Sequence, residues 1–331
     1  MAKRAAGGSE AHVAQAARDA LAKGNAVDAV VTGVLVAAAE SPGVFLGPVQ
    51  LLVGGAGAGL QAFDGRVRQP GLGIPRPRGV QAGDAVPASA RVGVPALPAA
   101  LAAVLAALGG STLKRAAGPA VERARAISAE RAAVLEVFAR RGAAAMGDDA
   151  VAGELAAVAG RAAGGTLTED DLRAVRPGVV TCEERALAPS GVLRVPWREA
   201  APGGTAGQVV VAADGRGLVA IACYEVAVDG VSITGLGLVA PAFATPVRRG
   251  ETRVRPGEPR PAAAPIALRA RRGVIDAAIG VAEADGAEAA LEALVARLDD
   301  AAALLEALGT GLGRPVAITR TGETAAVLAS R

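Results

Sequence analysis

Histidine is almost absent from this chain of 331 residues, and its scarcity limits the catalytic sites that the chain can build. A Ser-His-Asp triad, a Cys-His pair or a zinc site with several histidines would each have to use His12, the one histidine present. His12 lies in the segment AHVAQAARDAL, whose apolar spacing is typical of a helix. We interpret it as a solvated helix residue, which argues against histidine-dependent chemistry.

Cysteine is also scarce, and no cofactor motif replaces it. Cys182 and Cys223 share no CxxC spacing and stand in no cluster of partner ligands, so we expect reduced thiols and no metal site. The glycine run at 54–59 invites comparison with a dinucleotide fingerprint. However, Leu60 stands where that fingerprint needs its last glycine, and a strand-like segment follows instead of a helix. No cofactor is predicted.

Aromatic residues make up 2% of the chain, charged residues 20% and hydrophobic residues 52%, so the sequence predicts a folded protein with an aliphatic core. The formal net charge of +3 gives no argument for a nucleic-acid partner or an anionic membrane. The apolar runs at 29–39 and 97–108 are shorter than the ~20 residues of a membrane span. Because no apolar segment follows the initial MAKR, we expect a cytoplasmic protein.

Hydrophobic periodicity predicts helices and hairpins in alternation. The strands come mostly as hairpins, which favours antiparallel sheets packed against helices, an α+β fold. The predicted helices span 9–23, 26–39, 95–109, 115–142, 154–165, 166–175 and 285–309. The predicted hairpins span 49–67, 207–226 and 315–330. The basic, proline-interrupted stretch 247–273 is interpreted as a solvated loop and an edge strand, with a basic patch for an anionic partner as the alternative.

One short segment can carry chemistry without histidine. Gly203-Gly204-Thr205 leads directly into a strand-like run, 208–212. A threonine that begins a strand can act as a nucleophile if the chain is cut just before it, because the freed α-amine then accepts the hydroxyl proton. On these residues alone, an ordinary junction between a loop and a strand is the alternative.

The sequence resembles the γ-glutamyltransferase (glutathione hydrolase) family over most of its length. The most specific stretch, KGNAVDAVV at 23–31, is similar to the family's GGNAVDAAV. The segment 164–172 is close to its GGxLTxEDL, and 62–70 is similar to its D-x-R-E-x-A-P stretch. Segments 40–43, 92–95, 118–125, 205–215 and 322–331 follow further motifs of the family in the same order.

This resemblance implies an αββα sandwich of the Ntn-hydrolase type, with two antiparallel sheets between helical layers. It implies one domain over 1–331, with a part like the family's large subunit at 1–204 and a part like its small subunit at 205–331. Self-cleavage between Gly204 and Thr205 would release Thr205 as the catalytic nucleophile. Arg66 would hold the carboxylate of a small-molecule substrate, since a guanidinium forks onto a carboxylate.

Several family positions differ in this chain. Ala206-Gly207 replaces the threonine and histidine after the nucleophile, and Cys223-Tyr224-Glu225 replaces Thr-x-Asn on the next strand. The serines of the family's RP-x-S-S-M-x-P stretch are alanines at 260–265, and the oxyanion-hole glycines are not evident at 278–286. Three functions therefore stay open: an enzyme acting on a different amide or acyl bond, a catalytically degenerate protein whose cleft binds a ligand or partner, or a structural partner of an intact paralogue. The partner is expected to be a second copy of the chain, in a homo-oligomer, or a paralogue.

Overall fold

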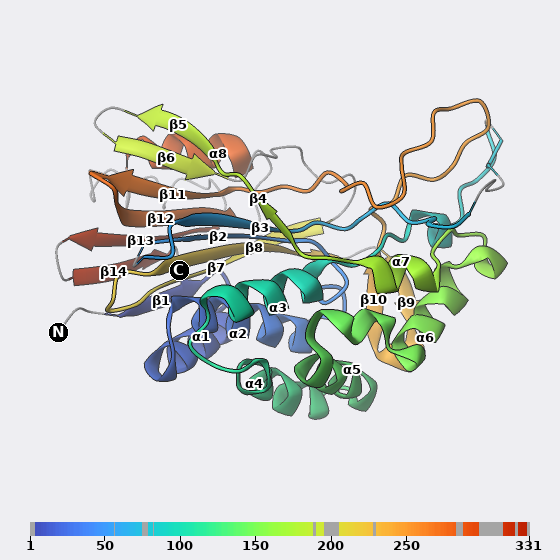
Figure 1. Cartoon of the computed structure of the whole chain (residues 1–331), viewed down its shortest axis with the longest axis horizontal. Coiled ribbons are helices and arrows are strands. Elements are labelled where there is room, and N and C mark those ends of the chain that lie inside the picture. The colour runs from blue at the N-terminus through green and yellow to red at the C-terminus, as the bar shows by residue number, and fades with distance from the viewer. Residues whose placement is uncertain are drawn as a thin grey trace.

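The structure is a computed structural model of the chain, and its elements form four layers (Figure 1). It describes residues 4–55, 57–74, 79–81, 83–187, 190–194, 205–227, 230–282, 287–297, 314–321 and 324–329. Two antiparallel six-stranded sheets lie face to face in the middle. Most helices cover the outer face of one sheet, and α8 covers the outer face of the other.

The first sheet has the strand order β1-β7-β8-β2-β3-β4. Its strands are β1 (Ala5–Gly8), β7 (Thr205–Ala213), β8 (Val219–Ala227), β2 (Val49–Gly54), β3 (Leu60–Gly65) and β4 (Gly178–Val180). The β7–β8 hairpin is the predicted one. Its turn is closed by Asp214, whose Oδ1 accepts hydrogen bonds from the backbone N–H groups of Arg216 (2.8 Å) and Leu218 (3.1 Å).

The second sheet has the strand order β14-β13-β12-β11-β6-β5. Its strands are β14 (Thr324–Ala329), β13 (Arg314–Thr321), β12 (Val274–Ala282), β11 (Ile266–Arg271), β6 (Ser190–Arg194) and β5 (Glu183–Leu187). The sequence places an edge strand within 247–273, and this prediction is wrong. Strand β11 lies inside the sheet, because the β5–β6 hairpin pairs with its other side. The predicted closing hairpin is confirmed as β13–β14.

The helices that cover the first sheet are amphipathic or fully apolar according to their depth. Helix α2 is buried along nearly its whole length between β7 and the outer helices α1 and α4, as its apolar sequence predicts. The helices are α1 (Ala11–Lys23), α2 (Ala26–Glu40), α3 (Leu97–Leu108), α4 (Leu113–Arg125), α5 (Ala129–Arg141), α6 (Asp149–Ala159), α7 (Glu169–Ala174) and α8 (Ala287–Val295). The short β9 (Gly230–Ile233) and β10 (Leu238–Pro241) form a separate two-stranded sheet.

Local details differ from the predictions at helix ends. The predicted helix 9–23 begins later, at Ala11, with Glu10 as its N-cap, and the hydroxyl of Ser9 donates a hydrogen bond to Gln208 Oε1 (2.6 Å). The predicted helix 115–142 is two helices, because Ser128 accepts a hydrogen bond from the N–H of Arg131 (3.2 Å) and begins α5. Thr168 and Asp171 form a capping box at the start of α7. Of the predicted helix 285–309, residues 287–297 lie within the described part.

Strand β7 is held closely from both sides. A Cβ at Gly33 of α2 would lie 2.9 Å from Val210 Cγ2, and a Cβ at Gly280 of β12 would lie 2.7 Å from Val209 Cγ1. Val210 and Val209 are both fully buried. These glycines therefore allow α2 to approach Val210 and the second sheet to approach the adjacent Val209. Among the helices of the described residues, none is long and apolar enough to cross a membrane.

Candidate functional site

The layer between the two sheets is apolar along most of its length and polar at one end. Val209, Val211 and Ile221 belong to its apolar part and pack against residues of the second sheet. Toward the end where β3 finishes and β7 begins, one rung of the first sheet contains Asp64, Gln50 and Cys223. All three are buried, with exposures of 2%, 0% and 0%. Burying polar groups is costly, so such a cluster is a candidate site.

Glu225 follows Cys223 two positions along β8, which by strand alternation places it on the same face. It is 2% exposed and lies opposite Gly207 of β7. Among the described residues, a Cβ at Gly207 would meet only Cys223 Sγ, at 4.0 Å. Burial, together with the negative charge of Glu225, raises the pKa of the Cys223 thiol, which makes this thiol a poor nucleophile at neutral pH.

Arg66 follows the last residue of β3 and is tied to Asp64. Its Nε and one terminal nitrogen donate to the two Asp64 carboxylate oxygens at 3.0 and 3.1 Å. Its backbone N–H also donates to Asp64 Oδ1, at 2.9 Å. A terminal nitrogen of Arg68 lies 2.9 Å from Asp64 Oδ2. One buried carboxylate therefore fixes two arginines at this end of the sheet.

A third arginine reaches the same region from the segment between β10 and β11. The N–H of Arg260 donates to the carbonyl of Val67 at 2.8 Å, and its side chain donates to Thr245 Oγ1 at 2.6 Å. Gln69 and the backbone of Thr245 exchange two hydrogen bonds of 2.8 and 2.9 Å, which anchors this segment beside β3. The surroundings of Arg66 are therefore cationic, as a site for a carboxylate requires.

Thr205 is the first residue of β7 and pairs with Ala227 of β8. The pairs β7–β8, β8–β2 and β2–β3 are each antiparallel, so β7 runs opposite to β3. The start of β7 and the residue after β3 therefore share one end of the sheet. At ~4.8 Å per strand, three strand spacings separate them by ~14 Å. Gly204 and the side chain of Thr205 lie outside the described residues.

The only histidine is on the other face of this sheet. Tyr224, whose neighbours Cys223 and Glu225 face the second sheet, belongs to the core shared with the helices and donates a hydrogen bond to Glu10 Oε2 at 2.6 Å. Nε2 of His12 lies 3.9 Å from Glu10 Oε1. The sheet thus separates His12 from the polar cluster. His12 lies in α1, which confirms the predicted helix position, and its side chain is partly buried.

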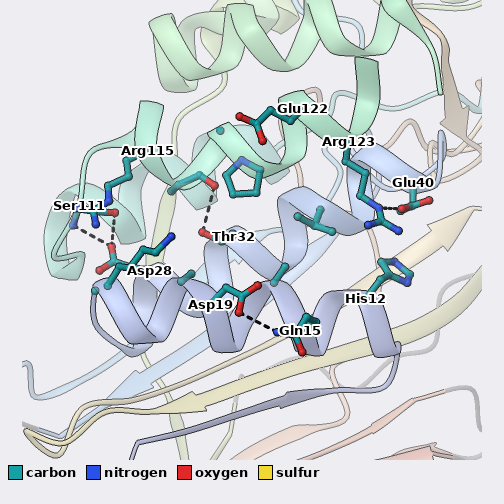
Figure 2. A pocket seen from close by; sticks show the side chains of 18 of the residues that line it. His12, Gln15, Asp19, Asp28, Thr32, Glu40, Ser111, Arg115, Glu122 and Arg123 are labelled. Atoms are coloured by element: carbon teal, nitrogen blue, oxygen red, sulfur yellow. Dashed lines mark hydrogen bonds and ion pairs between the residues drawn. The ribbon is translucent and has the colours of Figure 1, made fainter. Parts of the chain in front are cut away.

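His12 lines a groove on the helical side, which Figure 2 shows between α1 and α4 with α2 as its floor. The groove has a volume of about 1100 Å³. Two of its polar side chains form hydrogen bonds that join the helices around the groove. Thr32 Oγ1 donates to the carbonyl of Ala116 at 3.2 Å, and Ser111 Oγ donates to Asp28 Oδ1 at 2.9 Å. No group of three or more histidine, cysteine or acidic residues in the described ranges is arranged to hold a metal ion.

The structure brings together residues that the sequence did not single out as functional. Arg66 and the start of β7 lie at one end of the first sheet, and the roles of Arg66 and Thr205 stay predictions. Asp64, Gln50, Glu225 and Arg260 were not predicted as site residues. For Glu225, the available signal was an acidic residue in the otherwise apolar, strand-like run 219–227.

Comparison with known proteins adds information on the fold. No protein-family model matches the chain, and no curated protein matches it. The structure is similar to that of cephalosporin acylase from Bacillus halodurans, with a TM-score of 0.73 and 15% identity over 98% of this chain and 93% of that chain. It is also similar to the structure of LmbA2991HD, with a TM-score of 0.75 and 14% identity over 99% of this chain and 96% of that chain.

A γ-glutamyltranspeptidase from Pseudomonas nitroreducens, complexed with L-DON, overlaps with 56% of this chain and 69% of its own, at 20% identity and a TM-score of 0.48. That overlap is too partial to carry an argument. The two similarities over nearly the whole chain have low identities, and they concern the fold. Together with the sheet topology, they confirm the predicted αββα sandwich, with two antiparallel sheets between helices.

Proposed function

We propose that this chain is an N-terminal-threonine hydrolase or acyltransferase that acts on an amide or acyl bond of a small molecule bearing a carboxylate. One observation carries the proposal: Thr205 begins β7, a strand inside the first sheet, at the same end as the buried polar cluster and Arg66. The similarity to a protein named cephalosporin acylase supports an acyl-amide substrate. The low histidine content favours a nucleophile that supplies its own base.

In the proposed mechanism, the chain first cuts itself between Gly204 and Thr205. The hydroxyl oxygen of Thr205 then attacks the substrate carbonyl, and its proton passes to the new α-amine of the same residue. The C–N bond of the substrate breaks as the leaving amine takes up that proton. The resulting ester on Thr205 is released by water in hydrolysis, or by an amine in acyl transfer.

The substrate carboxylate would bind at Arg66, beside Arg68 and Arg260. Asp64 holds the Nε edge of Arg66 at 3.0 Å and so fixes the plane of the guanidinium. A fixed guanidinium loses little freedom when it binds a carboxylate, which favours recognition of planar anions.

Cleavage would divide the chain into 1–204 and 205–331 without separating the pieces. β7, from the second piece, pairs with β1 from the first, while β8 pairs with β2. In the other sheet, β11 pairs with β6 across the same division. The two pieces would therefore remain one folded unit with a shared core.

A catalytically degenerate binding protein is the second candidate function. Its specific support is that Arg66 already donates two side-chain hydrogen bonds to Asp64, as a purely structural arginine would. In this function the same end of the sheet would bind a carboxylate ligand, or a second copy or paralogue would cover it.

Chromogenic anilides distinguish these functions. Glutaryl-p-nitroanilide and γ-glutamyl-p-nitroanilide carry a carboxylate, and pentanoyl-p-nitroanilide provides an uncharged control of similar chain length. The proposal predicts release of nitroaniline from a carboxylate-bearing substrate, loss of that release in Thr205→Ala, and a raised KM in Arg66→Ala for the charged substrate alone. Absence of turnover across a broad panel of acyl anilides would support the degenerate alternative.

A further inference from the structure

A cavity of about 590 Å³ lies at the end of the first sheet that is remote from Arg66. Its walls include the β2–β3 turn at Gly57, the β7–β8 turn at 214–216 and the connection between α1 and α2 at 23–25. The nine residues of β7 run from Thr205 to this cavity, which at ~3.3 Å per residue is a separation of ~30 Å. The cavity is therefore distinct from the proposed substrate site.

Three cationic side chains from separate parts of the chain line this cavity. They are Arg4 just before β1, Lys23 at the end of α1 and Arg216 in the β7–β8 turn. Arg4 is held by a hydrogen bond of 2.9 Å to the carbonyl of Leu21, which is an uncharged partner. Within the described ranges, the side chains of Lys23 and Arg216 have no hydrogen bond or ion pair. Charges of one sign around a cavity concentrate its potential, and here they favour an anion.

The polar groups that could compensate these cations are already used within the fold. Asp214, the acidic residue of the lining, is 4% exposed, and its Oδ1 accepts the N–H groups of Arg216 and Leu218. Asn25 caps α2 with its side-chain oxygen and donates from Nδ2 to the carbonyl of Leu108 at 2.8 Å. With three cationic residues and one acidic residue, the lining has an excess of two positive charges at neutral pH.

The neighbouring carboxylate of Asp28 is also occupied. It is 2% exposed and accepts the backbone N–H groups of Asn25, Gly110 and Ser111 at 2.7, 3.1 and 3.0 Å. The Ser111 hydroxyl donates to it as well, at 2.9 Å, and Figure 2 shows this contact. Asp28 therefore fixes the connection between α3 and α4 to the start of α2.

The wall formed by the β2–β3 turn exposes backbone to the cavity. Gly57 has a φ of +80°, and a Cβ there would meet nothing within 4 Å. The turn is nevertheless packed against the other hairpin, because a Cβ at Gly55 would collide with the carbonyl oxygen of Gly217. A glycine backbone beside open space allows the oxygens of an anion to approach closely.

We propose that this cavity binds a small molecule that carries a multiply charged oxyanion group. The planar guanidinium groups of Arg4 and Arg216 suit phosphate or carboxylate oxygens, and the ammonium group of Lys23 adds a compact charge. The volume lies within the ~300–1,000 Å³ of small-molecule sites, which is more space than a single inorganic ion fills. The ligand class is therefore a phosphorylated or polycarboxylated small molecule.

Isothermal titration calorimetry of the full chain at low ionic strength tests the proposal. Pyrophosphate is the probe for a phosphorylated ligand and citrate is the probe for a polycarboxylate, so binding of either one supports the site and identifies the group it prefers. We expect Lys23→Gln and Arg216→Gln each to weaken binding at least ~10-fold. Added salt should weaken binding too, because the cations are exposed.

Lys114→Gln and Arg161→Gln are the matched controls. Each removes one exposed cation of the same kind from outside the lining of the cavity, so the change in net charge is the same. Both controls should bind the probe with the wild-type affinity. Arg66→Ala should also bind it with the wild-type affinity, because the proposed substrate site lies at the other end of the sheet.

Urea unfolding checks that Lys23→Gln and Arg216→Gln remain folded, as substitutions of exposed side chains should. The proposal is overturned if the wild-type chain binds neither probe, or if Lys23→Gln weakens binding no more than Lys114→Gln does. Loss of binding in Arg66→Ala alone would assign the anion to the proposed substrate site and would equally overturn it. The proposed function depends on none of these results.

Discussion

Arg66 and Asp64 form a two-point ion pair at the end of β3, with nitrogen–oxygen distances of 3.0 and 3.1 Å. Asp64 has a side-chain exposure of 3%, and that of Arg66 is 15%. The pair is therefore largely removed from water, and removing one partner leaves the other poorly compensated. The same contact that stabilises the fold also orients the residue proposed to bind a carboxylate.

Replacing Asp64 tests both roles of this pair. Asp64→Asn keeps the shape of the side chain but removes the negative charge that pairs with Arg66 and Arg68, so we expect the free energy of unfolding to fall by ~1–3 kcal/mol. The measurement is urea unfolding at neutral pH. Glu136→Gln is the control, because the Glu136–Arg125 pair is exposed and should contribute less than ~1 kcal/mol. Equal effects of the two variants would contradict a buried structural ion pair.

Alkaline pH should destabilise the protein through two buried groups. Burial raises the pKa of Cys223 above its ordinary value of 9.0. The pKa of Tyr224 is raised above its ordinary value of 10.0, mainly by burial and also by the charge of Glu10 and the hydrogen bond to Glu10. Above these ordinary values the unfolded chain loses protons that the folded chain keeps. Stability present at lower pH should therefore fall by up to ~1.4 kcal/mol per pH unit for each group.

Urea unfolding between pH 8 and ~11 checks this dependence, with the range chosen to cover both ordinary values. Cys223→Ala should make the decline less steep from about pH 9, and Tyr224→Phe should do so from about pH 10. Cys182→Ala is the comparison. Burial also raises the pKa of Cys182, but this residue is only partly buried, so the substitution should change the pH dependence of stability less than Cys223→Ala does. A decline unchanged in all three variants would show that other groups cause it.

The close contact between the sheets at Gly280 predicts a strong response to one added methyl group. Gly280→Ala would place a Cβ 2.7 Å from Val209 Cγ1, so we expect a loss of ~1–3 kcal/mol through overpacking. Gly153→Ala on α6 is the matched control, because a Cβ there meets nothing within 4 Å. That substitution should stabilise the helix by ~0.5–1 kcal/mol. Thermal unfolding should therefore show a lower midpoint temperature for Gly280→Ala and a higher one for Gly153→Ala.

Arg131 should stabilise the end of α2 through its specific geometry. Its Nε donates to the carbonyl of Gly237 at 3.0 Å, and one terminal nitrogen donates to the carbonyls of Ala39 and Glu40 at 2.7 and 3.0 Å. Lysine cannot reproduce this fork, so Arg131→Lys should cost ~1–3 kcal/mol in chemical denaturation. Arg140→Lys, on the exposed face of α5, should cost much less.

Much of the layered architecture is predictable from local signals. The apolar run 26–39 predicts a buried helix, and Asp214-Gly215 predicts the β7–β8 turn. Strand β1 is not predictable, because AAGG has little strand preference and forms a strand by pairing with β7. The placement of β11 inside its sheet depends in the same way on a distant hairpin.

The candidate site is less predictable, because it depends on contacts between segments far apart in the sequence. Thr205 and Arg66 follow from motif resemblance. The place of Glu225 in the buried polar cluster does not, because strand β8 is buried on both faces and its sequence does not show which residues face the second sheet. Only the register of β7 with β8 makes Glu225 and Thr205 neighbours.

Intact-mass measurement of the purified protein, with sequencing of any new N-terminus, tests the central claim most directly. The account predicts that the wild-type chain separates under denaturing conditions into 1–204 and 205–331, with Thr205 as the new N-terminal residue. Thr205→Ala should remain a single chain of 331 residues. A wild-type chain that stays intact in mature, folded material would contradict the account.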